Sequence, residues 1–189
     1  MARKRLISML GLLSVLGTSF SAQAAGWSLL PGLNDDFRTQ SALSVSLGAG
    51  HANSTTAMEY GAELSFNCVL LQPPSNVLRQ HLSYVNYSDG DFTMHKIELN
   101  PDYMFKVAKD ISIGAGPGVG MIVLNTADRD TTLGAFQLGA SMDYTGVKHL
   151  LVGVESRYQV STKRFYERDS ETYSHANNWR TAIRIGYQF

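Results

Sequence analysis

The chain has 189 residues, with 16 basic and 16 acidic side chains and a formal net charge of zero. Its length suits one domain, and its balanced charge gives no sign of nucleic acid as a partner. The single cysteine, Cys68, excludes an internal disulfide framework. We expect this thiol to pack as a small apolar side chain.

Residues 1–24 have the pattern of a cleaved secretory signal peptide. A basic start, MARKR, precedes the apolar stretch LISMLGLLSVLG, and the small residues of Ala22-Gln23-Ala24 form a cleavage site. No cysteine sits at this cleavage site, so lipoprotein processing is not expected. No later run of 18 apolar residues predicts a membrane-spanning helix. Residues 25–40 contain one proline and two glycines, and we expect them to form an irregular N-terminal leader.

From residue 41 onward, apolar and polar residues alternate with the period of a β-strand. The first such segment places Leu43, Val45 and Leu47 on one face, and serine and glycine on the other. Eight alternating segments are predicted, at residues 41–50, 58–71, 78–87, 95–105, 111–123, 135–144, 149–159 and 179–189.

Three features favour a membrane barrel over a soluble sandwich. The segments are about ten residues long, which is the length a tilted strand needs to cross a bilayer. Connections on one side are expected to be short and those on the other side longer, with 161–178 the longest. Aromatic residues gather near segment ends, as interfacial girdles do. Residues 41–189 are therefore predicted to be all-β, an eight-stranded antiparallel up-and-down transmembrane β-barrel, because a spanning sheet must close.

The signal peptide, the eight strands and the ending Tyr187-Gln188-Phe189 resemble small bacterial outer-membrane barrels. The nearest likeness is to the outer-membrane-protein A transmembrane domain and the outer membrane protein beta-barrel domain family. This resemblance implies a Gram-negative outer membrane, contact with membrane lipid, and recognition of Tyr187 and Phe189 by the barrel-assembly machinery. The extended form of that signal places glycine earlier than Gly186, so the match is partial. The resemblance implies an architecture and leaves the activity open.

The strand faces opposite the apolar ones carry an unusual number of charged residues, which we expect to face the barrel lumen. Buried charges must be paired, so arginines such as Arg180 and Arg184 are expected to bridge acids such as Glu59, Glu63 or Glu155. We interpret the set as a structural polar plug, because eight-stranded interiors are filled; an ion path is the alternative. The predicted lumenal network is Glu59, Glu63, Lys96, Glu98, Asp102, Asp143, Glu155, Arg157, Arg180 and Arg184, with Arg79 as a further candidate.

Two features of neighbouring strands leave alternatives open. The inward face of 111–123 has four glycines, Gly114, Gly116, Gly118 and Gly120, which either receive large side chains from elsewhere or border a lumenal pocket. Pro101 and Pro117 should lie nearly opposite each other, and neither can donate a backbone N–H. They produce local irregularities or, as resemblance to the lipid A palmitoyltransferase barrel implies, a lateral gate.

Candidate catalytic residues are few. His81 and Ser83 share a strand face, and Glu98 on the next strand could orient the histidine. This is loosely similar to the H-x-S motif of the lipid A deacylase barrel, which continues with asparagine where this chain has Tyr84. Because these side chains should face away from lipid, we predict no catalytic site.

The tripeptide His-Ala-Asn occurs twice, and its histidines, His51 and His175, could approach each other across the closed barrel. Coincidence in polar loops explains the repeat as well, so no metal site and no cofactor are predicted. The favoured function is a monomeric outer-membrane barrel with a structural or binding role. The alternatives are a lipid A-modifying enzyme and a narrow channel for a small solute.

Overall fold

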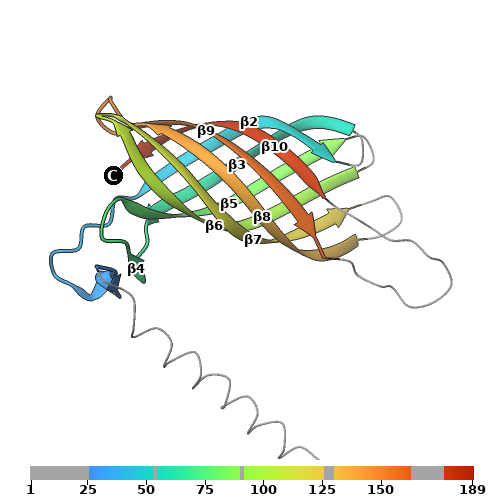
Figure 1. Cartoon of the computed structure of the whole chain (residues 1–189). Helices are drawn as coiled ribbons and strands as arrows, with labels where there is room; N and C mark the ends of the chain where they lie inside the picture. The colour runs from blue at the N-terminus through green and yellow to red at the C-terminus, as the bar shows by residue number, and fades with distance from the viewer. Residues whose placement is uncertain (1–25, 53–54, 90–91, 126–129, 163–176) are drawn as a thin grey trace, which may run out of the picture.

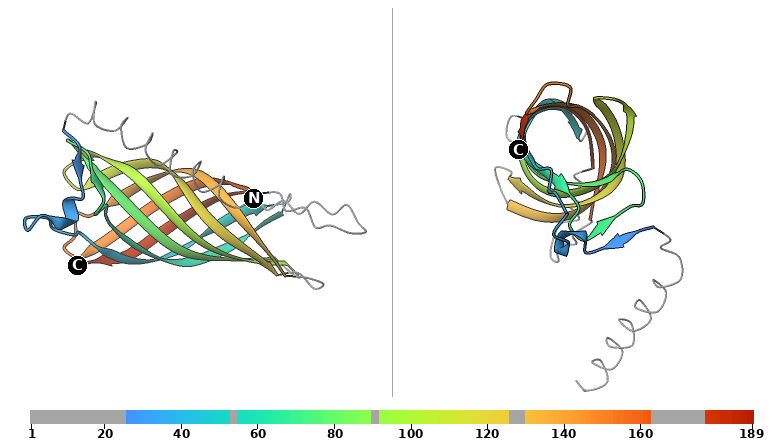
Figure 2. Two further views of the ribbon diagram at one scale, coloured as in Figure 1. Left: turned by 90° about the horizontal axis from the view of Figure 1, so that it is seen from below. Right: turned by 90° about the vertical axis from the view of Figure 1, so that its left-hand side faces the viewer.

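The computed structural model describes residues 26–52, 55–89, 92–125, 130–162 and 177–189. Eight long antiparallel strands close into one barrel, in the order β10-β2-β3-β5-β6-β7-β8-β9 (Figures 1 and 2). These strands are β2 (Ala42–Ala52), β3 (Thr55–Asn67), β5 (Val77–Asp89), β6 (Phe92–Ala108), β7 (Ile111–Asn125), β8 (Asp130–Tyr144), β9 (Leu150–Ser161) and β10 (Asn178–Gln188). The predicted all-β, eight-stranded, up-and-down architecture is confirmed. Among the described residues, no helix is long and apolar enough to cross a membrane.

The barrel closes where its first and last long strands meet. β10 pairs with β2 along its whole length, from Asn178 opposite Ala52 to Gln188 opposite Ala42. Beyond the ladder, the backbone N–H of Phe189 donates to the carbonyl of Ser41 over 2.9 Å. No edge strand is therefore left among the eight, which removes the unpaired backbone groups that hydrocarbon would penalise.

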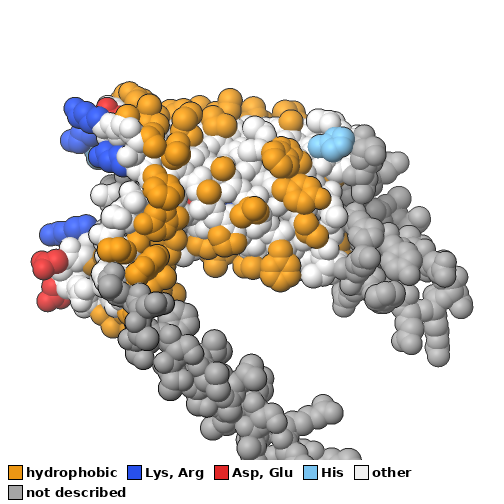
Figure 3. Space-filling model, viewed as in Figure 1, with side chains coloured by type: hydrophobic (Ala, Val, Ile, Leu, Met, Phe, Trp, Pro, Cys, Tyr) orange, Lys and Arg blue, Asp and Glu red, His pale blue; other side chains and the backbone are white. Residues whose placement is uncertain are grey.

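Alternation along each strand separates an exposed apolar wall from a buried polar lumen. On β8, Leu138 is 66% exposed, whereas its neighbour Gln137 is 6% exposed. Hydrophobic side chains cover the barrel wall, and most charged groups visible in the same view lie at the end that holds the C-terminus (Figure 3). This distribution is the inverse of a soluble domain, in which large apolar side chains are mostly inside. Outward apolar residues include Val45, Leu47, Tyr60, Ile97, Val119, Phe136, Val154, Tyr158, Trp179, Ile183 and Ile185.

The two ends of the barrel carry different connections. At one end lie the leader, the C-terminus and the connections 68–76, 109–110 and 145–149; we call it the short-turn end. At the other, the long-loop end, the widest connection joins β9 to β10. The expected difference in loop length rests on this one connection, because 68–76 at the short-turn end is longer than 53–54, 90–91 and 126–129. Two hairpins at the long-loop end have only two residues between their strands, 53–54 and 90–91. Their strands extend beyond the apolar segments into polar residues such as His51 and Thr56, whose side chains hydrogen-bond at 2.9 Å.

The leader is more ordered than the sequence predicts. Its strand β1 (Ser28–Leu29) pairs with β4 (Leu71–Gln72), which belongs to the connection between β3 and β5, and a 3-10 turn, η1 (Pro31–Leu33), follows. The expected strand 58–71 therefore ends earlier, at Asn67. Seen end-on, the described part of the leader lies beside the barrel mouth and does not cross the bore (Figure 2).

The two prolines of β6 and β7 interrupt one ladder without opening the wall. Pairing is continuous up to Leu99 opposite Val119 and resumes at Tyr103 opposite Ala115, so Pro101 and Pro117 face each other in the gap. This gap follows from the missing N–H groups. The strands nevertheless remain close, since a Cβ atom added at Gly116 would collide with the Pro101 carbonyl. The prolines therefore mark a local break in pairing.

Candidate functional site: the charged lumen and its two ends

The strands bring the predicted lumenal charges together in one interior network. Each of its ten members faces inward, is at most 5% exposed and belongs to at least one ion pair. The alternation of each strand explains the shared direction, and the narrow bore of an eight-stranded barrel brings facing walls within side-chain reach. These side chains therefore fill the middle of the barrel and connect strands that are not neighbours.

Arg184 on β10 joins three walls of the lumen near the short-turn end. Its Nη1 lies 2.6 Å from Glu63 Oε1 on β3, and its Nη2 lies 2.7 Å from Asp143 Oδ1 on β8. His81 on β5 contacts the same Glu63 oxygen at 2.8 Å through Nδ1. The guanidinium and the imidazole thus share one carboxylate, and Asp143 depends on Arg184 for its only ion pair among the described residues.

A second group of ion pairs lies deeper in the barrel. Arg180 contacts Glu98 at 2.6 Å and Glu155 at 3.0 Å. Arg157 donates from Nη2 to both oxygens of Asp102, each at 2.9 Å. Arg157 also contacts Glu155 at 3.4 Å. Each arginine thus bridges acids from different strands, which gives geometric specificity as well as charge neutralisation.

Nearest the long-loop end, the ion pairs give way to amides and then to apolar side chains. Lys96 pairs with Glu59, and its ammonium also donates to Asn178 at 3.4 Å. Above them lies an apolar cluster, which we call the cap, whose members come from five strands. The cap consists of Ala52, Tyr87, Met94, Ile122, Leu124, Leu133 and Ala135. The described interior is therefore apolar at this end of the lumen.

The cap is the part of the interior that the sequence pattern failed to predict. Ile122 and Leu124 share the parity of the inward glycines, and Met94 shares the parity of Lys96. The alternation used for the prediction made every outward residue apolar and every inward residue polar along the whole strand. A usable signal exists, because both faces of β7 become apolar from Met121 onward. Such a stretch indicates that the inward face has left the polar region.

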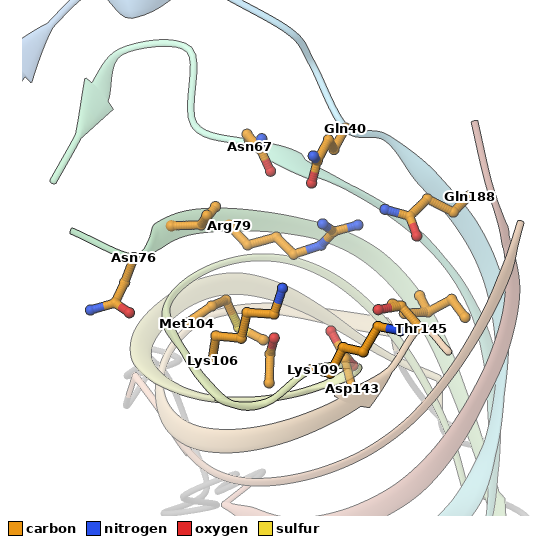
Figure 4. A pocket seen from close by; sticks show the side chains of 13 residues that line it. Gln40, Asn67, Asn76, Arg79, Met104, Lys106, Lys109, Asp143, Thr145 and Gln188 are labelled. Carbon is orange, nitrogen blue, oxygen red and sulfur yellow. The ribbon is translucent and has the colours of Figure 1, made fainter. Parts of the chain in front are cut away.

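At the short-turn end the lumen opens into a cavity of 480 Å³, which we call the vestibule (Figure 4). Arg79 from β5, Lys106 from β6 and Lys109 from the β6–β7 turn project toward it. Its other charged group is Asp143, which is paired with Arg184. The remaining lining residues are Gln40, Asn67, Asn76, Val77, Met104, Ser112, Thr145, Leu151 and Gln188. The vestibule is thus a cationic opening below the ion-pair network.

The four inward glycines do not line the vestibule, and side chains fill the lumen beside them. Side chains of β6 and β8 occupy the space. A Cβ atom at Gly114 would meet Met104, one at Gly118 would meet Asn100 and Gln137, and one at Gly120 would lie 3.2 Å from Glu98 Cγ. The glycines are therefore needed for close packing against β6, which is the first of the two interpretations of the sequence.

The weak catalytic candidates do not form a triad. His81 bonds to Glu63, whereas Ser83 donates to Glu98 Oε2 at 3.3 Å. No hydrogen bond between His81 and Ser83 is present in the described part of the chain, and the expected orientation of His81 by Glu98 is not what the structure has. Both side chains are at most 5% exposed inside the lumen. Neither can reach a lipid substrate outside the wall.

The remaining candidates lie at the ends of the barrel. His51 bonds to Thr56, while His175 lies outside the described residues, as does the predicted signal peptide. Within the described ranges, no group of three or more His, Cys, Asp or Glu side chains could hold a metal ion. Tyr187 and Phe189 are exposed at the short-turn end, with ring centroids 5.2 Å apart. Their role in assembly stays a prediction.

Comparison with known proteins identifies the fold. No family model and no curated protein matches the chain. Neisserial surface protein A matches with a TM-score of 0.51 and 14% identity, over 80% of this chain and 97% of that one. The N-terminal barrel of Pseudomonas aeruginosa OprF matches at 0.50 and 15%, over 80% and 100%. Ail of Yersinia pestis, crystallised with sucrose octasulfate, matches at 0.50 and 10%, over 80% and 97%.

These similarities place the chain in a structural class. It has the eight-stranded closed barrel of small outer-membrane proteins, and the resemblance predicted from its sequence is confirmed at the level of the fold. At these identities the likeness concerns architecture alone.

Proposed function

We propose that the chain is an integral outer-membrane barrel with a closed lumen, and that it has a structural or surface-binding role. The observation that carries this proposal is the combination of an exposed apolar wall with a buried interior of paired charges. Lipid would cover the wall at no cost in polar desolvation, while the ion pairs neutralise the interior. Outer-membrane lipid is therefore its principal partner.

The orientation follows from the two ends. In barrels of this class the turns on the periplasmic side are short and the extracellular loops are longer. The longest connection, residues 162–177, lies at the end opposite the leader, the C-terminus and the vestibule. We therefore assign the end that holds the vestibule to the periplasm. The long-loop end, with the cap beneath it, faces the outside.

A closed lumen argues against the channel alternative. An ion moving along the axis would have to displace Arg180 and Arg184 from their acids and then pass the apolar cap. Transfer of a charge through an apolar region without partners is strongly unfavourable. Planar-bilayer recording of the purified protein should give no conductance steps at any voltage tested, with a general porin as the positive control. Reproducible steps would refute the closed lumen.

The enzyme alternative has a separate test. Ser83→Ala removes the only hydroxyl beside His81 on its strand face, and Ser44→Ala, which alters another buried inward serine, is the matched control. Both variants should leave the acyl composition of lipid A unchanged. A change specific to Ser83→Ala would show that the lumen performs chemistry. Membrane location itself is tested by fractionation and by the shift in gel mobility on heating that folded barrels give.

A further inference from the structure

The vestibule differs from the rest of the lumen in the balance of its charges. Within the described residues, four of the five inward cations of the barrel interior, all except Arg79, have carboxylate partners. Arg79 is only 8% exposed, yet its Nε and Nη2 donate to a hydroxyl, Ser65 Oγ, at 3.2 and 2.9 Å. A buried guanidinium without a counterion is costly. Its position at an open cavity points to an anion supplied from outside the chain.

Two lysines add to this charge. Lys106 and Lys109 line the same cavity, are exposed at its mouth, and belong to no ion pair in the described part of the chain. The one acid of the lining, Asp143, is already held by Arg184. Three cations from three elements thus converge on a lining whose one acid, Asp143, is shared with Arg184 (Figure 4). Low-dielectric walls concentrate the field of such a cleft and attract anions.

We propose that the vestibule binds a phosphate monoester, with its phosphoryl group between Arg79, Lys106 and Lys109. A monoester carries nearly two negative charges at neutral pH and several acceptor oxygens, which suits three cations better than a carboxylate does. Arginine is also well matched to phosphate oxygens. The cavity of 480 Å³ exceeds the needs of inorganic phosphate and lies in the usual range of small-molecule sites. The neutral lining, including Thr145 and Gln188, would contact the organic part.

The location of this site in the periplasm rests on the proposed orientation, but the binding chemistry does not. The phosphoryl group could belong to a water-soluble ester or to a lipid headgroup at the inner leaflet, since the mouth lies at the level of the short turns. The two sources can be separated with the folded, full-length protein in a neutral maltoside detergent. Glycerol 3-phosphate is the soluble probe, short-chain phosphatidic acid is the lipid probe, and glycerol is the uncharged control.

Calorimetric titration should detect saturable binding of at least one phosphate probe and none of glycerol. Binding of the soluble probe identifies a site for free esters, and binding of the lipid probe alone identifies a headgroup site. Arg79→Gln should weaken binding by about tenfold or more, the value expected for one charge-assisted hydrogen bond. Lys106→Gln and Lys109→Gln should each weaken it severalfold, and added salt should weaken it further.

Lys148→Gln is the matched control, because Lys148 is exposed at the same end but does not line the cavity. Its affinity should stay within about twofold of the unchanged protein, well below the loss of one charge-assisted hydrogen bond. Gel mobility before and after heating verifies that every variant is folded. Absence of binding to both probes would overturn the proposal. So would equal affinity in Lys106→Gln, Lys109→Gln and Lys148→Gln, since these exposed substitutions should not affect folding. Neither result would affect the proposed membrane location.

Discussion

Replacement of Arg184 by methionine tests whether paired charges stabilise the barrel interior. Arg184 is fully buried and lies within 2.7 Å of both Glu63 and Asp143. Methionine keeps much of the side-chain volume but removes the charge. Asp143 then loses its ion pair, and among the described residues Glu63 keeps an ion-pair contact only with His81. Removing one partner of a buried ion pair costs about 3–5 kcal/mol, and we expect the free energy of unfolding to fall by that amount.

The measurement is reversible urea unfolding of the barrel in lipid vesicles, followed by tryptophan fluorescence. Arg79→Met is the matched control, because it removes the same group from a site whose side-chain partner is Ser65. Loss of these hydrogen bonds is partly offset by removal of a buried charge that has no ion pair, so the cost should stay below about 1–2 kcal/mol. Adding Asp143→Asn and Glu63→Gln to Arg184→Met should recover part of the loss, since the uncompensated carboxylates disappear. Equal costs at the two arginines, with no recovery, would refute the reasoning.

Three further predictions use the same unfolding assay. Gly116→Ala should cost about 1–3 kcal/mol, because its methyl group would meet a backbone carbonyl of β6. Gly134→Ala should be nearly neutral, since the nearest atoms to its methyl group lie at 3.5 Å. Equal effects of the two substitutions would contradict the packing role of the glycines. Lys96→Met should be more destabilising than the double change Lys96→Met with Glu59→Leu, because both side chains are at most 2% exposed and the lone carboxylate carries the penalty. Ile183→Arg on the exposed wall should cost about 2–4 kcal/mol in a bilayer, and a neutral effect would mean that lipid does not cover this residue.

The direction of each side chain could be predicted from the sequence, but its partner could not. Alternation places Arg180 and Arg184 on the inward face of β10, and the register of the neighbouring strands agrees with it. Which acid each arginine meets depends on the stagger of the strands around the barrel, which no local pattern contains. Glu59, expected as an arginine partner, instead contacts Lys96.

Features that break the uniform alternation were the hardest to predict. The cap was missed because Tyr87 and Met94 are apolar residues at inward positions. The pairing of β1 with β4 joins residues more than forty positions apart, from the leader and from the end of the predicted strand 58–71. The vestibule was missed because its cations come from three elements whose common mouth exists only in the closed barrel.

The most direct test of a lipid-covered barrel compares aliphatic side chains that point out of the barrel with aliphatic side chains that point into it. Ile183 and Ile185 are each 55% exposed outside the barrel, whereas Ile122 and Leu133 are at most 1% exposed in the cap. In protonated lipid nanodiscs, nuclear Overhauser effects between acyl chains and methyl groups should appear for Ile183 and Ile185 and be absent for Ile122 and Leu133. Lipid contacts at the cap methyl groups, or their absence at the wall, would contradict the assignment of lipid outside and a closed interior within.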